Sequence, residues 1–241
     1  MVPVPDAPDE ARVRQVRRIF STISDRYDFL NHFLSAGRDI AWRRFMVRRL
    51  RFFRTQRLLD LATGTGDVSI EAARIHPRLQ VFGLDFAAPM LQAAQPKIRR
   101  RGLANRVSNL QGDALNLPFS DEHFDAVTVA FGIRNMPDRA QVLREVRRVL
   151  VSGGGLYILE FTTPQSPFFR RLYFFYLNRL LPRLASWFTQ NPEAYQYLAE
   201  SIMKFPYPED FIREIREAYF LEVGKFPLSG GITYLYEGRK G

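Results

Sequence analysis

A glycine-rich turn between two apolar runs is the part of this sequence best placed to do chemistry. The run Arg57-Leu-Leu-Asp-Leu61 leads into Ala-Thr-Gly64-Thr-Gly66, and a second apolar run ends at Asp85, nineteen residues later. Glycines let the backbone turn sharply and approach a ligand closely. An acid at this distance can accept both hydroxyls of a ribose. The spacing therefore predicts a βαβ nucleotide-binding unit.

The turn departs from the pattern that binds a pyrophosphate. A dinucleotide-binding dehydrogenase would have a third glycine, where this chain has Asp67 and Val68. An acid at the start of a helix repels a pyrophosphate, but it suits a ligand that carries an amine or a sulfonium cation. S-adenosylmethionine (SAM) is such a ligand.

Composition limits the class of protein. The 241 residues are 46% hydrophobic, which is enough for one α/β domain with a helical addition. The chain has no cysteine, so disulfides and thiolate metal sites are excluded. The proline-rich, acidic start lacks the features of a signal peptide, and no run of eighteen apolar residues occurs. We expect a cytoplasmic protein, with peripheral attachment to the inner face of the cytoplasmic membrane as a further hypothesis.

The charge suggests phosphate-bearing partners. The formal net charge is +10 and the pI is about 10.2. Such a surface is attracted to nucleic acid or to an anionic membrane leaflet. A solvated surface in an arginine-rich proteome explains the charge equally well, so charge alone identifies no partner.

Apolar periodicity predicts a doubly wound α/β fold. Strands alternate with helices, which favours a mostly parallel, Rossmann-like sheet of seven strands with an antiparallel edge strand. A glycine run at 153–155 is expected to turn into the fifth strand. Strands are expected at 57–61, 79–84, 107–111, 124–130, 156–161, 221–226 and 232–239, and helices near 13–23 and at 38–53, 67–75, 139–150 and 209–219.

Several segments together resemble a known family. The turn at Asp60–Gly66, the acid Asp85, Gly112-Asp-Ala114 and the glycine run are similar to those of class I SAM-dependent methyltransferases. Three more groups of residues narrow the resemblance to the ubiquinone/menaquinone biosynthesis C-methyltransferases, which methylate a ring carbon of a polyprenylated quinol. They are Arg26-Tyr-Asp-Phe-Leu-Asn31 with Leu34-Ser35 and Trp42-Arg43, Phe131-Gly-Ile-Arg-Asn135, and Tyr195-Gln-Tyr-Leu-Ala-Glu-Ser-Ile202.

The resemblance covers about residues 16–240 and implies a division of the chain. Residues 1–10 would be a disordered tail and residues 11–56 an N-terminal helical lid. Residues 57–241 would form the methyltransferase domain, with a helical insertion at about 164–204.

The resemblance also implies which residues bind the cofactor SAM. Its methionine part would lie near the turn, and Asp85 would hold the ribose. A carboxylate and a small residue would border the adenine, and Ala130 stands where relatives have a serine that contacts SAM. Relatives often have a glycine at Ala62, and the alanine implies a less strained turn. The implied cofactor-binding residues are Gly64, Thr65, Gly66, Asp85, Asp113, Ala114 and Ala130.

Methyl transfer requires alignment more than acid–base chemistry, because the sulfonium is already activated. A quinol carbon becomes nucleophilic when the neighbouring hydroxyl loses its proton. The resemblance implies that Arg134 helps to activate the quinol. We assign it to stabilising the phenolate, since its pKa above about 12 makes it a poor base. Pairing within its own loop is the alternative. Asn135 and, in the lid, Asp28 are further candidates, with Tyr27 and Asn31 beside Asp28.

Three other features leave alternatives open. The acids Asp60, Asp85 and Asp113 come from different strands and have no His or Cys partners nearby, so no metal site is expected. His76 and His123 are expected to be solvated. Residues 167–188 mix aromatics with four arginines and an inner proline, which excludes a membrane span. That segment could line a tunnel, lie in the membrane interface or cover the sheet.

These features rank the functions. Methylation of demethylmenaquinol to menaquinol comes first, and methylation of a polyprenyl methoxy-benzoquinol from the ubiquinone route comes second. A nucleic-acid methyltransferase is weaker, because an Asn/Asp-Pro-Pro-aromatic motif and a cysteine nucleophile are both missing. A dehydrogenase and an inactive SAM-binding protein are weaker still. The expected partners are a polyprenylated quinol, an anionic membrane surface and a second copy in a homodimer, with no nucleic acid.

Overall fold

The computed structural model describes residues 35, 37–176, 179 and 192–241, with side chains of the last range from 197 onward. The predicted tail, the helix near 13–23, the lid residues Tyr27, Asp28 and Asn31, and part of the aromatic segment lie outside the described residues.

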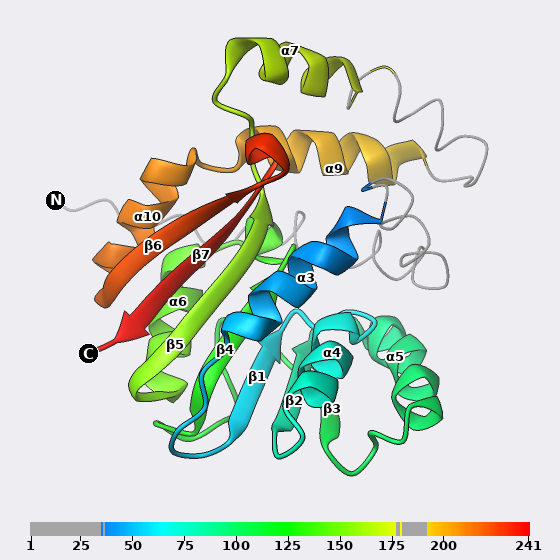
Figure 1. Cartoon of the computed structure of the whole chain (residues 1–241), viewed down its shortest axis with the longest axis vertical. Coiled ribbons are helices and arrows are strands. Elements are labelled where there is room, and N and C mark those ends of the chain that lie inside the picture. The colour runs from blue at the N-terminus through cyan, green and yellow to red at the C-terminus, as the bar shows by residue number, and fades with distance from the viewer. Residues whose placement is uncertain (1–34, 36, 177–178, 180–191) are drawn as a thin grey trace, which may run out of the picture.

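Seven strands form one sheet, in the order β3-β2-β1-β4-β5-β7-β6 (Figure 1). The first five run parallel, and β7 is antiparallel to both of its neighbours. The predicted fold class is confirmed, with the reversed strand lying just inside the edge strand β6. The strands are β1 (Arg57–Leu61), β2 (Gln80–Asp85), β3 (Val107–Gln111), β4 (Phe124–Ala130), β5 (Leu150–Phe161), β6 (Phe220–Leu228) and β7 (Thr233–Lys240).

Helices cover both faces of the sheet. One core cluster joins the strands to α3 (Arg38–Arg49), α4 (Asp67–Ile75) and α5 (Ala88–Arg100). A second cluster joins them to α6 (Arg139–Val149) and α10 (Pro208–Glu217). Two more helices, α7 (Pro167–Phe175) and α9 (Pro192–Lys204), lie beyond the carboxyl ends of the parallel strands, at the top of Figure 1.

The sequence pattern explains this layering. The first six residues of β4 are buried, as expected for a central parallel strand that is covered on both faces. Helix α6 buries Val142, Leu143, Val146 and Val149 on one stripe, and the Asp138 carboxylate caps its start by accepting from the N–H of Gln141. The sheet therefore lies between two apolar cores.

Two predicted boundaries are wrong for identifiable reasons. The helix expected at 38–53 ends at Arg49, because Leu50 is extended and the backbone N–H groups of residues 54–56 instead donate to the buried carboxylate of Asp125, at 2.7–3.0 Å. The fifth strand begins at Leu150 rather than 156. The glycine run lies inside it, where Gly153 has a φ of 76° and the register with β4 shifts.

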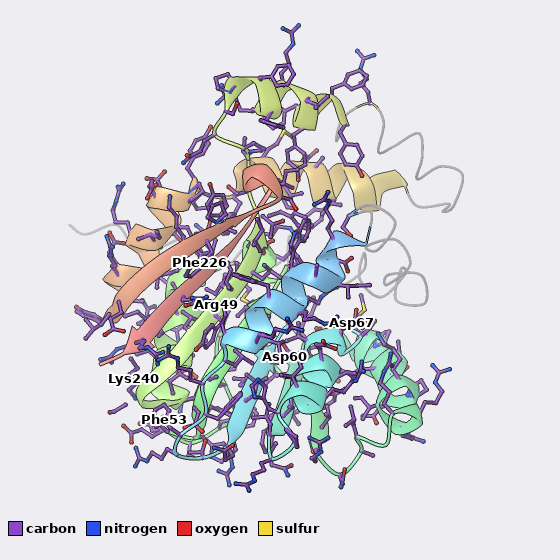
Figure 2. All side chains as sticks on the ribbon, in the orientation of Figure 1. Arg49, Phe53, Asp60, Asp67, Phe226 and Lys240 are labelled. Carbon is purple, nitrogen blue, oxygen red and sulfur yellow. The ribbon has the colours of Figure 1, made fainter. Side chains whose placement is uncertain are left out.

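Helix α3 is part of the same core as the strands. Met46 and Val47 are fully buried. Figure 2 shows Arg49 near Phe226, with the guanidinium carbon 4.0 Å from the ring centroid, and Arg49 also pairs with Glu237 of β7. The described part of the predicted lid is thus packed firmly against the sheet.

Candidate functional site

The predicted site residues of the described chain meet at the carboxyl edge of the parallel strands. The strand order reverses between β1 and β4, the point where open α/β sheets bind their ligands. The N–H of Gly64 donates to Asp85 at the end of β2, at 2.8 Å, and the N–H of Gly112 donates to the carbonyl of Asp85 at 3.0 Å. A Cβ on Gly132 would lie 2.6 Å from the Ala62 Cβ, so the loops after β1 and β4 are in contact.

The glycine turn has one open side and one packed side. Gly64 has a φ of 57°, and a Cβ there would meet no atom within 4 Å. Gly66 has a φ of 81°, and a Cβ there would lie 3.3 Å from Ala94 of α5. Both backbone conformations favour glycine. The turn is held by α5 and leaves space for a ligand beside Gly64.

Asp60 fixes the turn and is buried beneath it. Its Oδ2 accepts from the hydroxyl of Thr63 at 2.7 Å and from both the N–H and the hydroxyl of Ser69, at 3.1 and 2.7 Å. Its Oδ1 accepts from the hydroxyl of Thr128 on β4, at 2.9 Å. Burial raises the pKa of Asp60, and these hydrogen bonds oppose the rise. Asp60 therefore joins β1, α4 and β4.

Asp85 ends β2 and lies against the glycine turn. Its Oδ2 accepts from the N–H of Gly64 and its Oδ1 from the N–H of Ala87, at 2.8 and 2.9 Å. Burial raises the pKa of Asp85, and hydrogen bonds from the backbone of Ala87, Gly64 and Phe86 act against that rise. A carboxylate has about four acceptor positions, so Asp85 can still accept from a ligand beside these backbone donors.

The remaining cofactor candidates border the same edge. Asp113 is exposed, and its Oδ1 accepts from the N–H of Leu115 at 2.9 Å. Ala114 is half-buried, and Ala130 lies half-buried at the last position of β4, paired with Leu159. The acid, the open glycine and the small residues suit the ribose, methionine and adenine parts of SAM.

Thr65 and Asp67 take part in an ion-pair network. The Lys97 ammonium donates to the Thr65 hydroxyl at 3.2 Å and to the Asp67 carboxylate at 2.5 Å. Arg43 of α3 lies 3.8 Å from the same carboxylate. Figure 2 shows Asp67 beside α3. Protein cations therefore neutralise Asp67, and the expectation that it would select a cationic ligand does not hold.

Ser35 and Arg43 connect α3 to this network, and both belong to the first of the three groups of residues that resemble the quinone C-methyltransferases. The Ser35 hydroxyl donates to Asp39 at 2.6 Å, and Asp39 pairs with Arg43. The Arg43 guanidinium carbon lies 5.4 Å from the ring centroid of Phe131. The contacts of Arg43 with Asp67 and Phe131, and those of Lys97 with Thr65 and Asp67, were missed in the sequence, since these partners lie on other elements.

Arg134 is buried in a hydrogen-bond network. It belongs to the 3-10 turn η2 (Ile133–Asn135) and is 6% exposed. One guanidinium nitrogen donates to Glu160 and to the carbonyl of Phe131, both at 2.6 Å, and Nε donates to Ser201 at 3.3 Å. The backbone N–H of Arg134 donates to the other Glu160 oxygen at 3.2 Å. Burial raises the pKa of Glu160, while the positive charge of Arg134 opposes the rise. The contact with the Phe131 carbonyl lies within the loop, as the alternative for Arg134 expects, whereas the ion pair is made outside the loop, with Glu160 of β5.

Asn135 is held by Tyr197, a residue of the family-resembling segment Tyr195–Ile202. Its Oδ1 accepts from the hydroxyl of Tyr197 on α9, at 2.9 Å. Glu160, Tyr197 and Ser201 were not among the predicted site residues. A charged residue inside the apolar strand 156–161 could have indicated Glu160, and the four-residue spacing of Tyr197 and Ser201 places both on one helix face.

Aromatic rings form an apolar wall beside this loop. Phe131 and Phe161 stack with centroids 4.5 Å apart, and Trp42 lies 6.0 Å from Phe161 in an edge-to-face arrangement. In α7, Tyr173 is buried, and Arg134 and Glu160 are among the charges that affect its hydroxyl. Burial raises the pKa of Tyr173. Such a wall suits an aromatic, apolar ligand.

Backbone strain lies on both sides of the site. Ala62 has a φ of 54° and Phe131 has a φ of 59°, in the left-handed region that is costly for residues other than glycine. The expectation that alanine at position 62 relaxes the turn is wrong, because the turn needs a positive φ there whichever residue it carries.

Neither described histidine is solvated in the way we expected. His76 is half-buried, with Nε2 3.1 Å from the carbonyl of Val47. His123 lies at the amino end of β4, half-buried, with Nε2 3.2 Å from a guanidinium nitrogen of Arg57. In the described part of the chain, no cluster of three His, Asp or Glu side chains could hold a metal, and no helix there is long and apolar enough to cross a bilayer.

The fold and this edge are those of a class I SAM-dependent methyltransferase. The ubiE/COQ5 methyltransferase family matches residues 8–240. The chain is 42% identical over 94% of its length to the ubiquinone/menaquinone biosynthesis C-methyltransferase UbiE of Geotalea uraniireducens, covering 96% of that protein. It is 41% identical over 99% of its length to the demethylmenaquinone methyltransferase of Deinococcus radiodurans, covering 97% of it.

A solved structure supports the fold. It is a SAM-dependent methyltransferase from Thermotoga maritima, described as a possible histamine N-methyltransferase, with a TM-score of 0.64 and 21% identity, covering 93% of this chain and 99% of the other. The chain belongs to the ubiE/COQ5 methyltransferase family and is a SAM-dependent C-methyltransferase. The predicted family, enzyme class and cofactor are confirmed.

Proposed function

We propose that this enzyme methylates a ring carbon of a polyprenylated quinol, with demethylmenaquinol as the first candidate and menaquinol as its product. The names of the two relatives support this acceptor class. The observation that carries the proposal is the contact between the two loops. The Arg134 loop after β4 packs on the glycine turn at Gly132, so a ring beside Arg134 would adjoin a donor held at Gly64.

The proposed donor site consists of Gly64, Thr65, Gly66, Asp85, Asp113, Ala114 and Ala130. SAM, when bound, supplies an electrophilic methyl group on a sulfonium. Asp85 would bind the ribose hydroxyls, and the open side of Gly64 would admit the methionine part. The chain's own task is then to place the acceptor carbon in line with that methyl and to exclude water.

Arg134 is the proposed stabiliser of the acceptor. A quinol oxygen that loses its proton carries negative charge, and delocalisation makes the neighbouring ring carbon nucleophilic. A fixed guanidinium lowers the energy of that phenolate, most strongly where water is excluded. Asn135 would orient the ring through its amide. Asp28, outside the described residues, remains the proposed group that orients a water or the quinol. After transfer, the methylated carbon loses its proton and the ring regains aromaticity.

Transfer of a labelled methyl from SAM tests the function directly. We would offer demethylmenaquinol, the methoxy-benzoquinol and bulk RNA in parallel. Label in the naphthoquinol supports the first proposal, and label in the benzoquinol alone moves the enzyme to the ubiquinone route. Label in RNA alone would refute quinol methylation. Arg134→Lys should keep its affinity for S-adenosylhomocysteine and lose about 100-fold or more in kcat. Full turnover by that variant would remove the role of Arg134.

We further propose that the enzyme works at the inner face of the cytoplasmic membrane. Helix α7 exposes four large apolar side chains beside Arg170 and Arg171, and the net charge of +10 favours an anionic surface. The apolar side chains, with their exposed fractions, are Phe168 (74%), Phe169 (52%), Leu172 (56%) and Phe175 (59%).

Co-sedimentation with vesicles that contain anionic lipid tests this attachment. The double change Phe168→Ser and Phe169→Ser should release the protein at low salt. Phe53→Ser is the matched control, because Phe53 is 56% exposed and lies at the end of the molecule opposite α7 (Figure 2). No binding of the unmodified protein to vesicles would refute the proposal.

A homodimer is the last partner that we propose. The edge strand β6 adjoins two exposed apolar side chains, Tyr219 (75%) and Leu221 (58%), which supports an edge-to-edge contact. Sedimentation velocity should then show a dimer that Leu221→Lys dissociates, and a monomer for the unmodified chain would refute it.

A further inference from the structure

Arg134 and Asn135, the two residues proposed to act on the quinol, are held by side chains from other elements. Glu160 of β5 binds the Arg134 guanidinium at 2.6 Å and the Arg134 N–H at 3.2 Å, so one carboxylate holds both ends of the residue. Ser201 of α9 accepts from Arg134 Nε at 3.3 Å, and Tyr197 of α9 donates to Asn135 at 2.9 Å. The 3-10 turn is therefore held from two elements.

The contacts from α9 come from one helix face. Tyr197 and Ser201 are four residues apart, which brings their side chains to the same side of a helix. The Ser201 hydroxyl donates to the carbonyl of Leu198 at 2.9 Å, so its oxygen is turned with its lone pairs toward the arginine. This geometry gives a role to the segment Tyr195–Ile202, which resembled the family without an assigned purpose.

Burial makes this network a weak source of stability. Glu160 is fully buried, Ser201 is 4% exposed and Arg134 is 6% exposed. Removing two charges from water costs free energy that their attraction often only balances, so a buried ion pair is weak evidence for stability. The same pair fixes the direction of a planar guanidinium, because its donors form a rigid fork. Fixed direction is what stabilisation of a developing phenolate needs.

We infer that Glu160, Ser201 and Tyr197 are positioning residues for methyl transfer. Glu160 and Ser201 aim the Arg134 guanidinium, and Tyr197 aims the Asn135 amide. This inference rests on the proposed role of the Arg134 loop in quinol methylation. In this role, α9 and β5 act through the Arg134 loop and not through contact with the quinol.

Kinetics of four single variants test the inference. The substitutions are Ser201→Ala, Tyr197→Phe, Glu160→Asp and, as control, Met203→Ala, which changes an exposed side chain of α9. Each of the first three should lower kcat by roughly tenfold to a hundredfold, the effect of losing a hydrogen bond to a charged or orienting group. Affinity for S-adenosylhomocysteine, measured by calorimetry, should not change, and Met203→Ala should match the unmodified enzyme.

A double-mutant cycle separates positioning from general structural support. If Ser201 acts through the guanidinium, Ser201→Ala should lower kcat hardly at all in an Arg134→Lys background, because lysine has no guanidinium for Ser201 to orient. Additive losses, or a lower melting temperature with parallel loss of S-adenosylhomocysteine affinity, would overturn the inference. So would full turnover by both Ser201→Ala and Tyr197→Phe.

The positioning role and the proposed function can fail separately. If Arg134→Lys loses turnover while Ser201→Ala and Tyr197→Phe keep it, the positioning role fails and the proposed function stands. If Arg134→Lys keeps full turnover, or if no quinol is methylated by the unmodified enzyme, the proposed function fails and the positioning role fails with it.

Discussion

The half of the site proposed for the methyl donor and the half proposed for the acceptor are built by different means. On the donor side, Asp60 accepts hydrogen bonds from Thr63 and Ser69, which lie within nine residues of it, and from Thr128 on the adjacent strand. Asp85 accepts hydrogen bonds from backbone N–H groups. On the acceptor side, the side-chain partners of Arg134 are 26 and 67 residues away in the chain. Neighbouring residues and backbone N–H groups supply most of the hydrogen bonds of the donor half, whereas side chains from distant elements hold the acceptor half.

This difference separates stability from turnover. The donor half is part of the core that folds β1 to α4 and β4, so damage there should cost stability or donor affinity. The acceptor half holds a charge pair whose loss should cost turnover. Four predictions follow this division, and each could break it.

The largest effect is expected at Asp60. Replacement by alanine leaves the buried hydroxyls of Thr63, Ser69 and Thr128 without their acceptor. The free energy of unfolding should fall by about 3–5 kcal/mol. Chemical denaturation measures it, with Asp121→Ala as control because that carboxylate is 74% exposed. A loss at Asp60 no larger than the loss at Asp121 would show that the turn does not depend on this carboxylate.

The next effect concerns donor affinity at Asp85. Asparagine keeps the shape of the side chain but removes the charge that strengthens bonds to ribose hydroxyls. We expect affinity for S-adenosylhomocysteine to fall about tenfold, or about 1.4 kcal/mol, by calorimetry. Arg134→Lys, on the acceptor side, should leave this affinity unchanged. Equal losses in the two variants would mean that the halves are not separate.

The same division explains what could be predicted from the sequence. Apolar runs predicted the observed bounds of β1, β3 and β4, and the stop at His76-Pro77 predicted the end of α4, because local sequence and burial agree there. Gly64, Gly66 and Asp85 were predictable because their spacing along one βαβ unit fixes their distance in space. Glu160, Ser201 and Lys97 were not, because tertiary packing alone brings them to Arg134, Thr65 and Asp67. The positive φ of 54° at Ala62 was missed as well, because no local pattern in the sequence indicates it.

A smaller effect is expected at Ala62. Glycine there should raise the free energy of unfolding by about 0.5–1 kcal/mol, because relief of the left-handed strain exceeds the greater chain entropy of glycine in the unfolded state. The φ of 54° at Ala62 motivates the change, and Gly102→Ala, at a φ of 66°, is the converse control and should destabilise. The thermal melting temperature checks both: it should rise for Ala62→Gly and fall for Gly102→Ala. If Ala62→Gly destabilises, the Ala62 methyl group that touches the Gly132 loop matters more than the strain.

The smallest effect lies outside both halves, at His123. Burial lowers the pKa of His123, and the charge of Arg57 lowers it further. The unfolded chain therefore binds the His123 proton more tightly than the folded chain does. The stability contribution of His123 is fully present above its ordinary pKa of about 6.5, and it is lost as the pH falls through that value toward the lowered pKa of the folded state.

The unfolding free energy of His123→Asn should thus depend less on pH between 7.5 and 5.5 than that of the unmodified protein. Arg57→Gln should reduce the dependence in part. His123 adjoins the amino end of β4 and Arg57 lies at the amino end of β1, both far from the ligand edge. S-adenosylhomocysteine affinity and turnover at pH 7.5 should therefore stay the same in both variants. A change in either would mean that this edge of the sheet is coupled to the site.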